Sequence, residues 1–138
     1  MLISVKCSNN LTTSILAMNA DTFRLLVTYG QTYLLRIINV ALNTELFFSV
    51  SHHEFIVVFL YASYMKPYTK KVMILGPGQI TDVLLTTNKH FGKYYTTSRA
   101  YSSSSSAPFN NNIATTILEY KGSPYFFSSS VSQPPILQ

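Results

Sequence analysis

The 138-residue sequence is poor in charge, has one cysteine and has no tryptophan. Charged residues make up 11% of it, whereas about a quarter is usual in soluble domains, and such a shortage is typical of a chain covered by other protein. The single cysteine, Cys7, excludes an internal disulfide, so its thiol is free or bonds to another chain or domain. No apolar run is long enough to predict a membrane span or a signal peptide.

The basic residues that give the formal charge of +5 are scattered, apart from one cluster at Lys66, Lys70 and Lys71. Nucleic-acid binding requires a basic stripe interleaved with exposed aromatic residues or a known motif, and the sequence shows neither. A solvated basic surface is therefore expected, with no nucleic acid as partner. Asn10 begins an Asn-Leu-Thr sequon, which makes it a candidate N-glycosylation site and hints at a secreted context.

Tyrosine, phenylalanine, valine and threonine recur in short runs, and this composition favours strands. The run Gln31–Asn39 is apolar on both faces, which predicts the middle strand of a sheet packed between two layers. Arg36 interrupts it. An unpaired buried guanidinium is costly, so we expect Arg36 to find a carboxylate or carbonyls as a structural pin. The functional alternative is an anion or substrate clamp.

The whole pattern predicts an all-β fold, a Greek-key β-sandwich or barrel of seven or eight strands. The segment Leu11–Ala20 reads as a short helix, and Ala62–Lys71 as a loop. The spacing between Leu46–Val50 and Phe55–Tyr61 suits a hairpin. Ser123–Gln138 is rich in serine and proline and reads as a linker or tail. The expected strands are Thr22–Val27, Thr32–Val40, Leu46–Val50, Phe55–Tyr61, Val72–Leu75, Ile80–Thr87, Tyr94–Tyr101 and Ile113–Tyr120.

Twelve short segments stand out in order along the chain: Asp21–Leu25, Tyr29–Asn39, Ala41–Asn43, Glu45–Phe48, Ala62–Tyr64, Lys66-Pro67, Pro77–Gln79, Val83–Leu85, Tyr94-Tyr95, Arg99–Tyr101, Pro108-Phe109 and Ile117–Gly122. In this order and spacing they resemble the second cupredoxin (plastocyanin-like) domain of plant laccases, which are multicopper oxidases. The resemblance covers residues 21–122; residues 1–20 are a poorly assigned lead-in, and 123–138 are the tail. Within the lead-in, Cys7-Ser8 looks like the family's cysteine that ties this domain to the first by a disulfide.

The resemblance implies a parent enzyme of three such domains whose copper ligands lie in the two outer ones. Such an enzyme oxidises lignin-type phenols and reduces oxygen to water, outside the plant cell in the apoplast. The middle domain spaces the outer domains and helps to shape the phenol pocket. This chain would then bind no cofactor itself, have flanking cupredoxin domains as partners, and be inactive alone.

The histidines agree with that expectation on chemical grounds. A blue copper site needs two histidines and a cysteine thiolate, and a trinuclear cluster needs several His-X-His pairs. The sequence has only His52, His53 and His90, and the adjacent pair would point to opposite faces of a strand. Cys7 has no histidine nearby. We therefore predict no copper site in this chain, and a structural hydrogen-bonding role for His53, which matches a histidine usual in the family.

Lys71 is the candidate substrate-pocket residue. By the resemblance, an acidic residue usually stands at this position near the phenol site, and another stands at Tyr61. An acid there could accept the phenolic proton during oxidation, which a protonated lysine cannot do. The plainer alternative is that Lys71 is a solvated loop residue in a diverged copy.

Other catalytic arrangements lack support in the sequence. No serine lies in a Gly-X-Ser-X-Gly elbow, and nothing brings Asp82 and Glu119 together as an acid–base pair. Three alternatives to the structural role stay open. The chain could assemble with separate outer domains through Cys7, act as a non-catalytic binding module for phenolics or carbohydrate, or be a truncated gene product without function.

Overall fold

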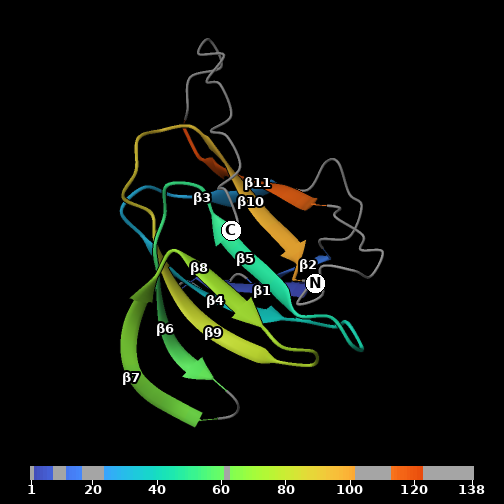
Figure 1. Ribbon diagram of the computed structural model, residues 1–138. Helices are drawn as coiled ribbons and strands as arrows, with labels where there is room; N and C mark the ends of the chain where they lie inside the picture. Colours follow the sequence, from blue (N-terminus) through green and yellow to red (C-terminus); the bar gives the residue numbers. More distant parts are fainter. Residues whose placement is uncertain (1, 8–11, 17–23, 61–62, 102–112, 123–138) are drawn as a thin grey trace.

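The computed structural model describes residues 2–7, 12–16, 24–60, 63–101 and 113–122, and these form strands and no helix (Figure 1). The all-β fold class is confirmed, with eleven strands in the described ranges against the seven or eight expected. No helix long and apolar enough to cross a membrane occurs in them. The strands are β1 (Leu2–Cys7), β2 (Thr12–Leu16), β3 (Arg24–Val27), β4 (Thr32–Ile38), β5 (Leu46–Val50), β6 (Phe55–Leu60), β7 (Ser63–Lys70), β8 (Val72–Leu75), β9 (Ile80–Thr86), β10 (Lys93–Ala100) and β11 (Ile113–Tyr120).

The strands form two sheets. One has six strands in the order β2-β1-β4-β9-β6-β7, and the other has five in the order β3-β11-β10-β5-β8. Neighbouring strands are antiparallel throughout, except for the parallel pair β3 and β11. The chain passes repeatedly from one sheet to the other, so each sheet is built from segments distant in sequence.

Strand β4 lies inside the six-stranded sheet, between β1 and β9, as the apolar run Gln31–Asn39 predicts. Its side chains alternate strictly: Tyr33, Leu35 and Ile37 are buried. On the opposite face Arg36 is exposed, whereas burial there was expected. The reason is that, among the described residues, a second layer of strands covers only one face of this sheet.

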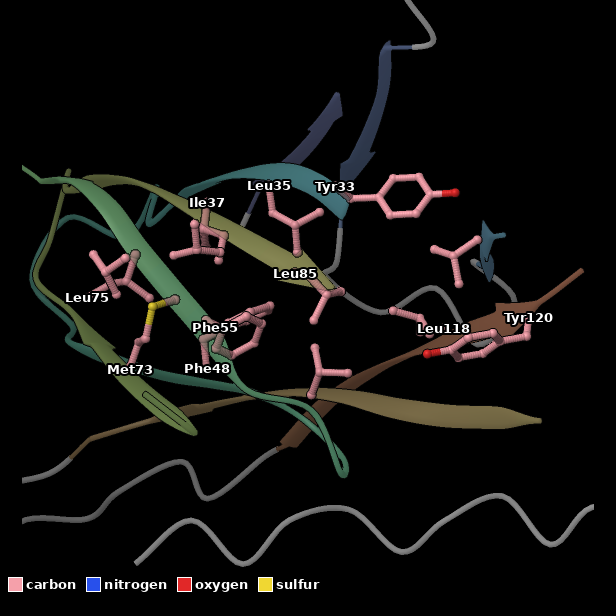
Figure 2. Close-up of a cluster of buried hydrophobic side chains, with 14 residues drawn as sticks. Tyr33, Leu35, Ile37, Phe48, Phe55, Met73, Leu75, Leu85, Leu118 and Tyr120 are labelled. Carbon is pink, nitrogen blue, oxygen red and sulfur yellow. The ribbon is translucent and has the colours of Figure 1, made fainter. Parts of the chain in front are cut away.

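The core lies between the two sheets, where their inward-facing side chains meet (Figure 2). Phe48 of β5 and Phe55 of β6 belong to different sheets, and their ring centroids are 5.4 Å apart. Burying such side chains is the main driving force for joining the sheets, at about 1.5–3 kcal/mol each. The largest fully buried side chains are Tyr120, Phe48, Phe55, Leu35, Ile37, Leu75, Leu85, Leu118, Val27, Val57 and Val83.

Two turns depend on glycine. Gly30, between β3 and β4, has φ of 79°, and Gly78, between β8 and β9, has φ of 69°. Side chains with a Cβ rarely adopt these angles, so glycine is the residue that closes both turns. Buried Asn39 holds the second turn in place, because its backbone carbonyl accepts from the N–H of Gly78 and its N–H donates to the carbonyl of Gln79. Its side-chain amide donates to the carbonyls of Thr44 and Leu75.

Three local expectations from the sequence are wrong. Part of Leu11–Ala20 is strand β2, because its threonines and isoleucine favour strands and it pairs with β1. Most of Ala62–Lys71 is edge strand β7, where a proline is tolerated because no other described strand pairs with its outer side. Finally, β5 and β6 are not a hairpin: they belong to different sheets, and the link between them passes from one sheet to the other.

Candidate functional site

A shallow groove of about 180 Å³ lies on the outer face of the six-stranded sheet, over β6, β7 and β9. Its floor is aliphatic, because Ile56 and Leu84 are paired directly across β6 and β9. Thr69 is paired with Ile56 from the other side, on β7. The rest of its wall is polar. The lining residues are Glu54, Ile56, Thr69, Leu84, Thr86, Asn88 and Lys89.

Lys71, the candidate pocket residue, lies beside this groove rather than in it. Its Nζ is 3.6 Å from Oε1 of Glu54, and both side chains are exposed. A carboxylate is therefore present next to residue 71, although it comes from a different segment. Leu60 and Ser63, which flank residues 61–62, pair at the opposite end of the β6–β7 hairpin from Lys71.

Arg36 has a carboxylate partner on the neighbouring strand. Its Nε and Nη2 donate hydrogen bonds to the two carboxylate oxygens of Asp82, each at 2.8 Å. The residues are directly opposite each other on β4 and β9. The side chain of Arg36 is 49% exposed and that of Asp82 only 9%, so the pair serves mainly to neutralise the buried carboxylate. The hydrogen bonds to Asp82 raise the pKa of the Arg36 guanidinium, which stays charged.

His53 is buried and engaged at both ring nitrogens. Nδ1 lies 2.7 Å from the carbonyl oxygen of Ser51, and Nε2 lies 2.8 Å from the hydroxyl of Tyr120. A carbonyl can only accept, so Nδ1 carries the proton and Nε2 accepts from the phenol. The Tyr120 oxygen also accepts from the backbone N–H of Lys89 at 3.2 Å. Burial lowers the pKa of His53, because it penalises the charged imidazolium.

Aromatic rings surround this pair. The ring of Tyr94 is 4.9 Å from that of His53 and 5.6 Å from that of Tyr120. Phe91 and Tyr29 complete the group, at 6.4 and 6.5 Å from Tyr120. Burial raises the pKa of the phenols of Tyr94 and Tyr120, so both stay protonated. The cluster ties the end of β11 to the segment that follows β5.

Asp82 and Glu119 are not an acid–base pair. Asp82 belongs to the six-stranded sheet and is held by Arg36, whereas Glu119 lies on β11 of the other sheet. Glu119 is 3.3 Å from Nη1 of Arg24 and 4.0 Å from Nζ of Lys93. Each carboxylate therefore neutralises a cation of its own sheet.

Comparisons with known proteins decide the family. The family model described as multicopper oxidase matches residues 3–123. The chain belongs to the multicopper oxidase family. It is 50% identical over 104 residues to Laccase-5 of Arabidopsis thaliana, covering 75% of this chain and 18% of that protein. To Laccase-12 of the same plant it is 55% identical over 92 residues, covering 67% of this chain and 16% of the relative.

A solved structure agrees with this assignment. The laccase of Botrytis aclada superimposes with a TM-score of 0.66 at 29% identity, covering 83% of this chain and 21% of that enzyme. The expected cupredoxin-like fold and the resemblance to plant laccases are thus confirmed. The chain spans less than a quarter of the length of each of these proteins.

Copper is the metal that membership of this multicopper oxidase family implies, and the described residues do not fit it. His53 could ligate through Nε2 only by giving up the Tyr120 hydroxyl, since Nδ1 carries a proton. His52 and His90 are exposed, and no three histidine, cysteine or acidic side chains gather within the described ranges. Cys7 lies on β1, opposite Tyr33 of β4. Asn10 lies outside the described residues.

Sequence reasoning missed two residues of these sites, Tyr120 and Glu54. Tyr120 is 67 positions from His53, and no short-range pattern links them. The signal for Glu54 was closer in sequence, because Glu54 directly precedes the expected strand Phe55–Tyr61, whose first residue pairs with Lys70 at the end of β7. Treating Ala62–Lys71 as a loop concealed that pairing.

Proposed function

We propose that this multicopper oxidase chain is the central, second cupredoxin domain of a laccase-like enzyme, and that it holds no copper ligand. One observation carries the proposal: a match of 50% identity that covers most of this chain falls on 18% of a laccase. The hydrogen bonds that occupy His53 support it, because they leave that imidazole without a free lone pair. The domain limits, residues 21–122 with a lead-in and a tail, belong to this proposal.

The parent enzyme would oxidise lignin-type phenols and reduce oxygen to water, in the plant apoplast. Copper in the flanking domains would supply the one-electron chemistry, and this chain would hold those domains in place. The apolar outer faces of its sheets would pack on those domains, and Cys7 would form the interdomain disulfide. Asn10 would carry the glycan of a secreted protein. Alone, the chain would be catalytically silent.

This chain's contribution to substrate handling would come from Lys71 and Glu54, which form an ion pair. A phenol that loses an electron also releases its proton, and a carboxylate accepts that proton well. Lys71 cannot accept it while protonated. Glu54, at 3.6 Å from the Lys71 ammonium, is the group that would take it from a phenol lying beside Lys71.

A chimeric enzyme tests the role. The segment of Arabidopsis Laccase-5 that this chain matches is replaced by the chain, and the chimera is compared with Laccase-5 lacking that segment. We expect the chimera to bind copper and oxidise a phenol such as 2,6-dimethoxyphenol, and the deletion to do neither. A folded chimera without copper would contradict the proposal.

A second experiment tests the proposal on the isolated chain. After copper loading and dialysis, elemental analysis should find negligible copper, and a phenol-oxidation assay should find no turnover. Stoichiometric copper together with turnover would overturn the assignment. Repeating the loading with His52→Ala and His90→Ala variants would then identify the ligands.

A further inference from the structure

The hydroxyl of Tyr120 is placed to release its proton to a base. Its oxygen lies 2.8 Å from Nε2 of His53, which accepts the hydrogen bond because Nδ1 carries the proton and donates to the carbonyl of Ser51. The backbone N–H of Lys89 donates to the same phenol oxygen at 3.2 Å and fixes its position. The fold therefore sets the phenol, the base and the tautomer of the base.

Two other tyrosines lack such a base. The hydroxyl of Tyr33 accepts from the N–H of Thr28 at 2.8 Å, and the hydroxyl of Tyr94 donates to the carbonyl of His90 at 2.7 Å. Neither an amide N–H nor a carbonyl takes up a phenolic proton. Tyr120 differs from both, because its partner is a neutral imidazole.

A phenol beside a base is easily oxidised by one electron. The phenol radical cation is a very strong acid, so the electron leaves more readily when the proton can leave with it. The sequence has ten tyrosines and no tryptophan, so no indole competes for the oxidising equivalent. Among Tyr33, Tyr94 and Tyr120, the base beside Tyr120 makes it the easiest to oxidise.

Aromatic rings lead from Tyr120 to the surface. Tyr120 lies at one end of the buried cluster and is only 1% exposed (Figure 2). The rings of Tyr29 and Phe91 lie 6.5 and 6.4 Å from it, and they are 52% and 55% exposed. Electrons tunnel over such distances, whereas a solvent-borne radical does not reach the buried phenol. Tyr120 can therefore give an electron to an oxidant at the surface without touching it.

We propose that Tyr120 and His53 form a redox site that reduces one-electron oxidants, such as organic peroxyl radicals, at the surface formed by Tyr29 and Phe91. The Tyr120 ring loses one electron to the oxidant. Its O–H bond breaks, and the proton forms an N–H bond at Nε2 of His53. The peroxyl radical becomes its anion, which takes a proton from water to give a hydroperoxide. A reductant such as ascorbate returns the electron, and the proton goes back to the phenol oxygen.

Burial of the site does not prevent this proton transfer. Burial lowers the pKa of His53, and Lys89 and His52 lower it further, whereas the hydrogen bond to the Ser51 carbonyl raises it. A phenol radical cation is nevertheless a much stronger acid than an imidazolium. The step needs neither copper nor neighbouring domains, so the inference can fail while the proposed function stands.

Flash photolysis of the full chain with tris(bipyridine)ruthenium and persulfate tests this inference, with fewer ruthenium(III) ions formed than chains. Exposed tyrosyl radicals couple with one another, so EPR should show one tyrosyl signal that outlasts them, on buried Tyr120. Tyr120→Phe should remove this persistent signal. The amide in His53→Gln accepts a hydrogen bond but not a proton, so formation of the radical should slow at least about a hundredfold.

Two substitutions serve as matched controls. Tyr33→Phe removes a buried phenol that has no base, and His90→Gln removes an exposed histidine. Both should keep the persistent signal. The inference is overturned if no such signal forms, if it survives in Tyr120→Phe, if His53→Gln forms it at the same rate, or if Tyr33→Phe also removes it.

Isotopic labelling keeps the test decisive if the Tyr120 and His53 variants do not fold. After the transfer, the imidazolium N–H of His53 donates to the tyrosyl oxygen, so a heavy-nitrogen label in the histidines should change the hyperfine spectrum of the radical. This readout reports the proton at Nε2, which a purely structural hydrogen bond would not place there. A spectrum that the label leaves unchanged would overturn the inference.

Discussion

At the scale of single residues, His53 shows how one buried side chain couples folding to pH. Burial lowers the pKa of its imidazole because it penalises a positive charge, and this effect outweighs the hydrogen bond to the Ser51 carbonyl, which raises that pKa. Electrostatic interactions with Lys89 and His52 lower the pKa of His53 further. Protonation would require breaking the hydrogen bond from the Tyr120 hydroxyl.

We predict that the free energy of unfolding falls as the pH drops below about 6.5, the ordinary pKa of an unfolded histidine. Below that pH His53 binds a proton in the unfolded chain but not in the folded one, so lowering the pH favours unfolding. Above that pH the His53 imidazole is neutral in both the folded and the unfolded chain, and its full contribution to the free energy of unfolding is present. Urea denaturation between pH 5 and 8 measures the slope.

Two variants test whether His53 causes this pH dependence of the free energy of unfolding. His53→Gln should remove most of it, whereas His90→Gln, at an exposed histidine, should keep it. If His53→Gln does not fold, an NMR titration of the unmodified chain replaces it, and a midpoint for His53 at or above 6.5 would contradict the prediction.

The residue scale also shows the limit of reasoning from sequence. That Arg36 would need a carboxylate followed from its place in an apolar run, but nothing in the sequence named Asp82, 46 positions away. The hydroxyl of Tyr120 was equally unforeseen. Partners of this kind become visible only when the strand register is known.

At the scale of elements, the Arg36–Asp82 pair joins β4 to β9 across the centre of a sheet. Arg36→Met should destabilise the chain by about 1–3 kcal/mol, because it leaves the buried carboxylate of Asp82 without its donors. Asp82→Asn should cost a similar amount. The double variant should lose about 1 kcal/mol less than the sum of the two.

Denaturant unfolding of the three variants measures that coupling. Thr32→Ala is the control, because Thr32 and Thr86 form an exposed contact of 3.3 Å between the same two strands. Its effect should stay within about 0.5 kcal/mol. Strictly additive losses for Arg36 and Asp82 would show that the pair does not stabilise the sheet.

The ion pair beside the groove makes a second prediction at this scale. Lys71→Glu places a second carboxylate beside Glu54 and should cost about 0.5–1 kcal/mol at low salt. Adding Glu54→Lys should recover the loss. Unfolding in 1 M salt should abolish both effects, because the groups are exposed; a loss that persists there would assign the cost to packing.

Elements rich in residues that favour strands could be predicted from the sequence, and elements defined by their partners could not. Leu46–Val50, Val72–Leu75 and Ile113–Tyr120 have the predicted bounds, since each is a short run rich in aliphatic, aromatic or β-branched residues. Strand β7 was missed because Pro67 and its lysines read as a loop. The sequence also could not show that β5 and β6 face each other across the core, because a four-residue link suits a hairpin equally well.

At the scale of the whole molecule, the outer faces of the sheets are apolar enough to need a cover. On the five-stranded sheet, Ile74 pairs with Phe47, and Phe47 and Ile113 flank Arg99 in one row across four strands. Ile74 and Ile113 are about half exposed. The low content of charge, 11%, gives such a surface little to keep molecules apart.

We therefore predict that the purified chain associates with itself and binds a hydrophobic dye, as exposed apolar patches do. The double variant Ile74→Thr/Ile113→Thr keeps residues that favour strands but removes two apolar side chains from the row. It should shift the chain toward monomer in light scattering and lower the dye signal.

The matched control is Val40→Thr/Leu42→Thr, which removes two exposed apolar side chains from the loop after β4. It should leave the association unchanged, because these residues lie outside the row. Equal loss of association in both variants would mean that general hydrophobicity drives it. A chain that is monomeric without any substitution and binds no dye would remove the physical argument that neighbouring domains cover this face.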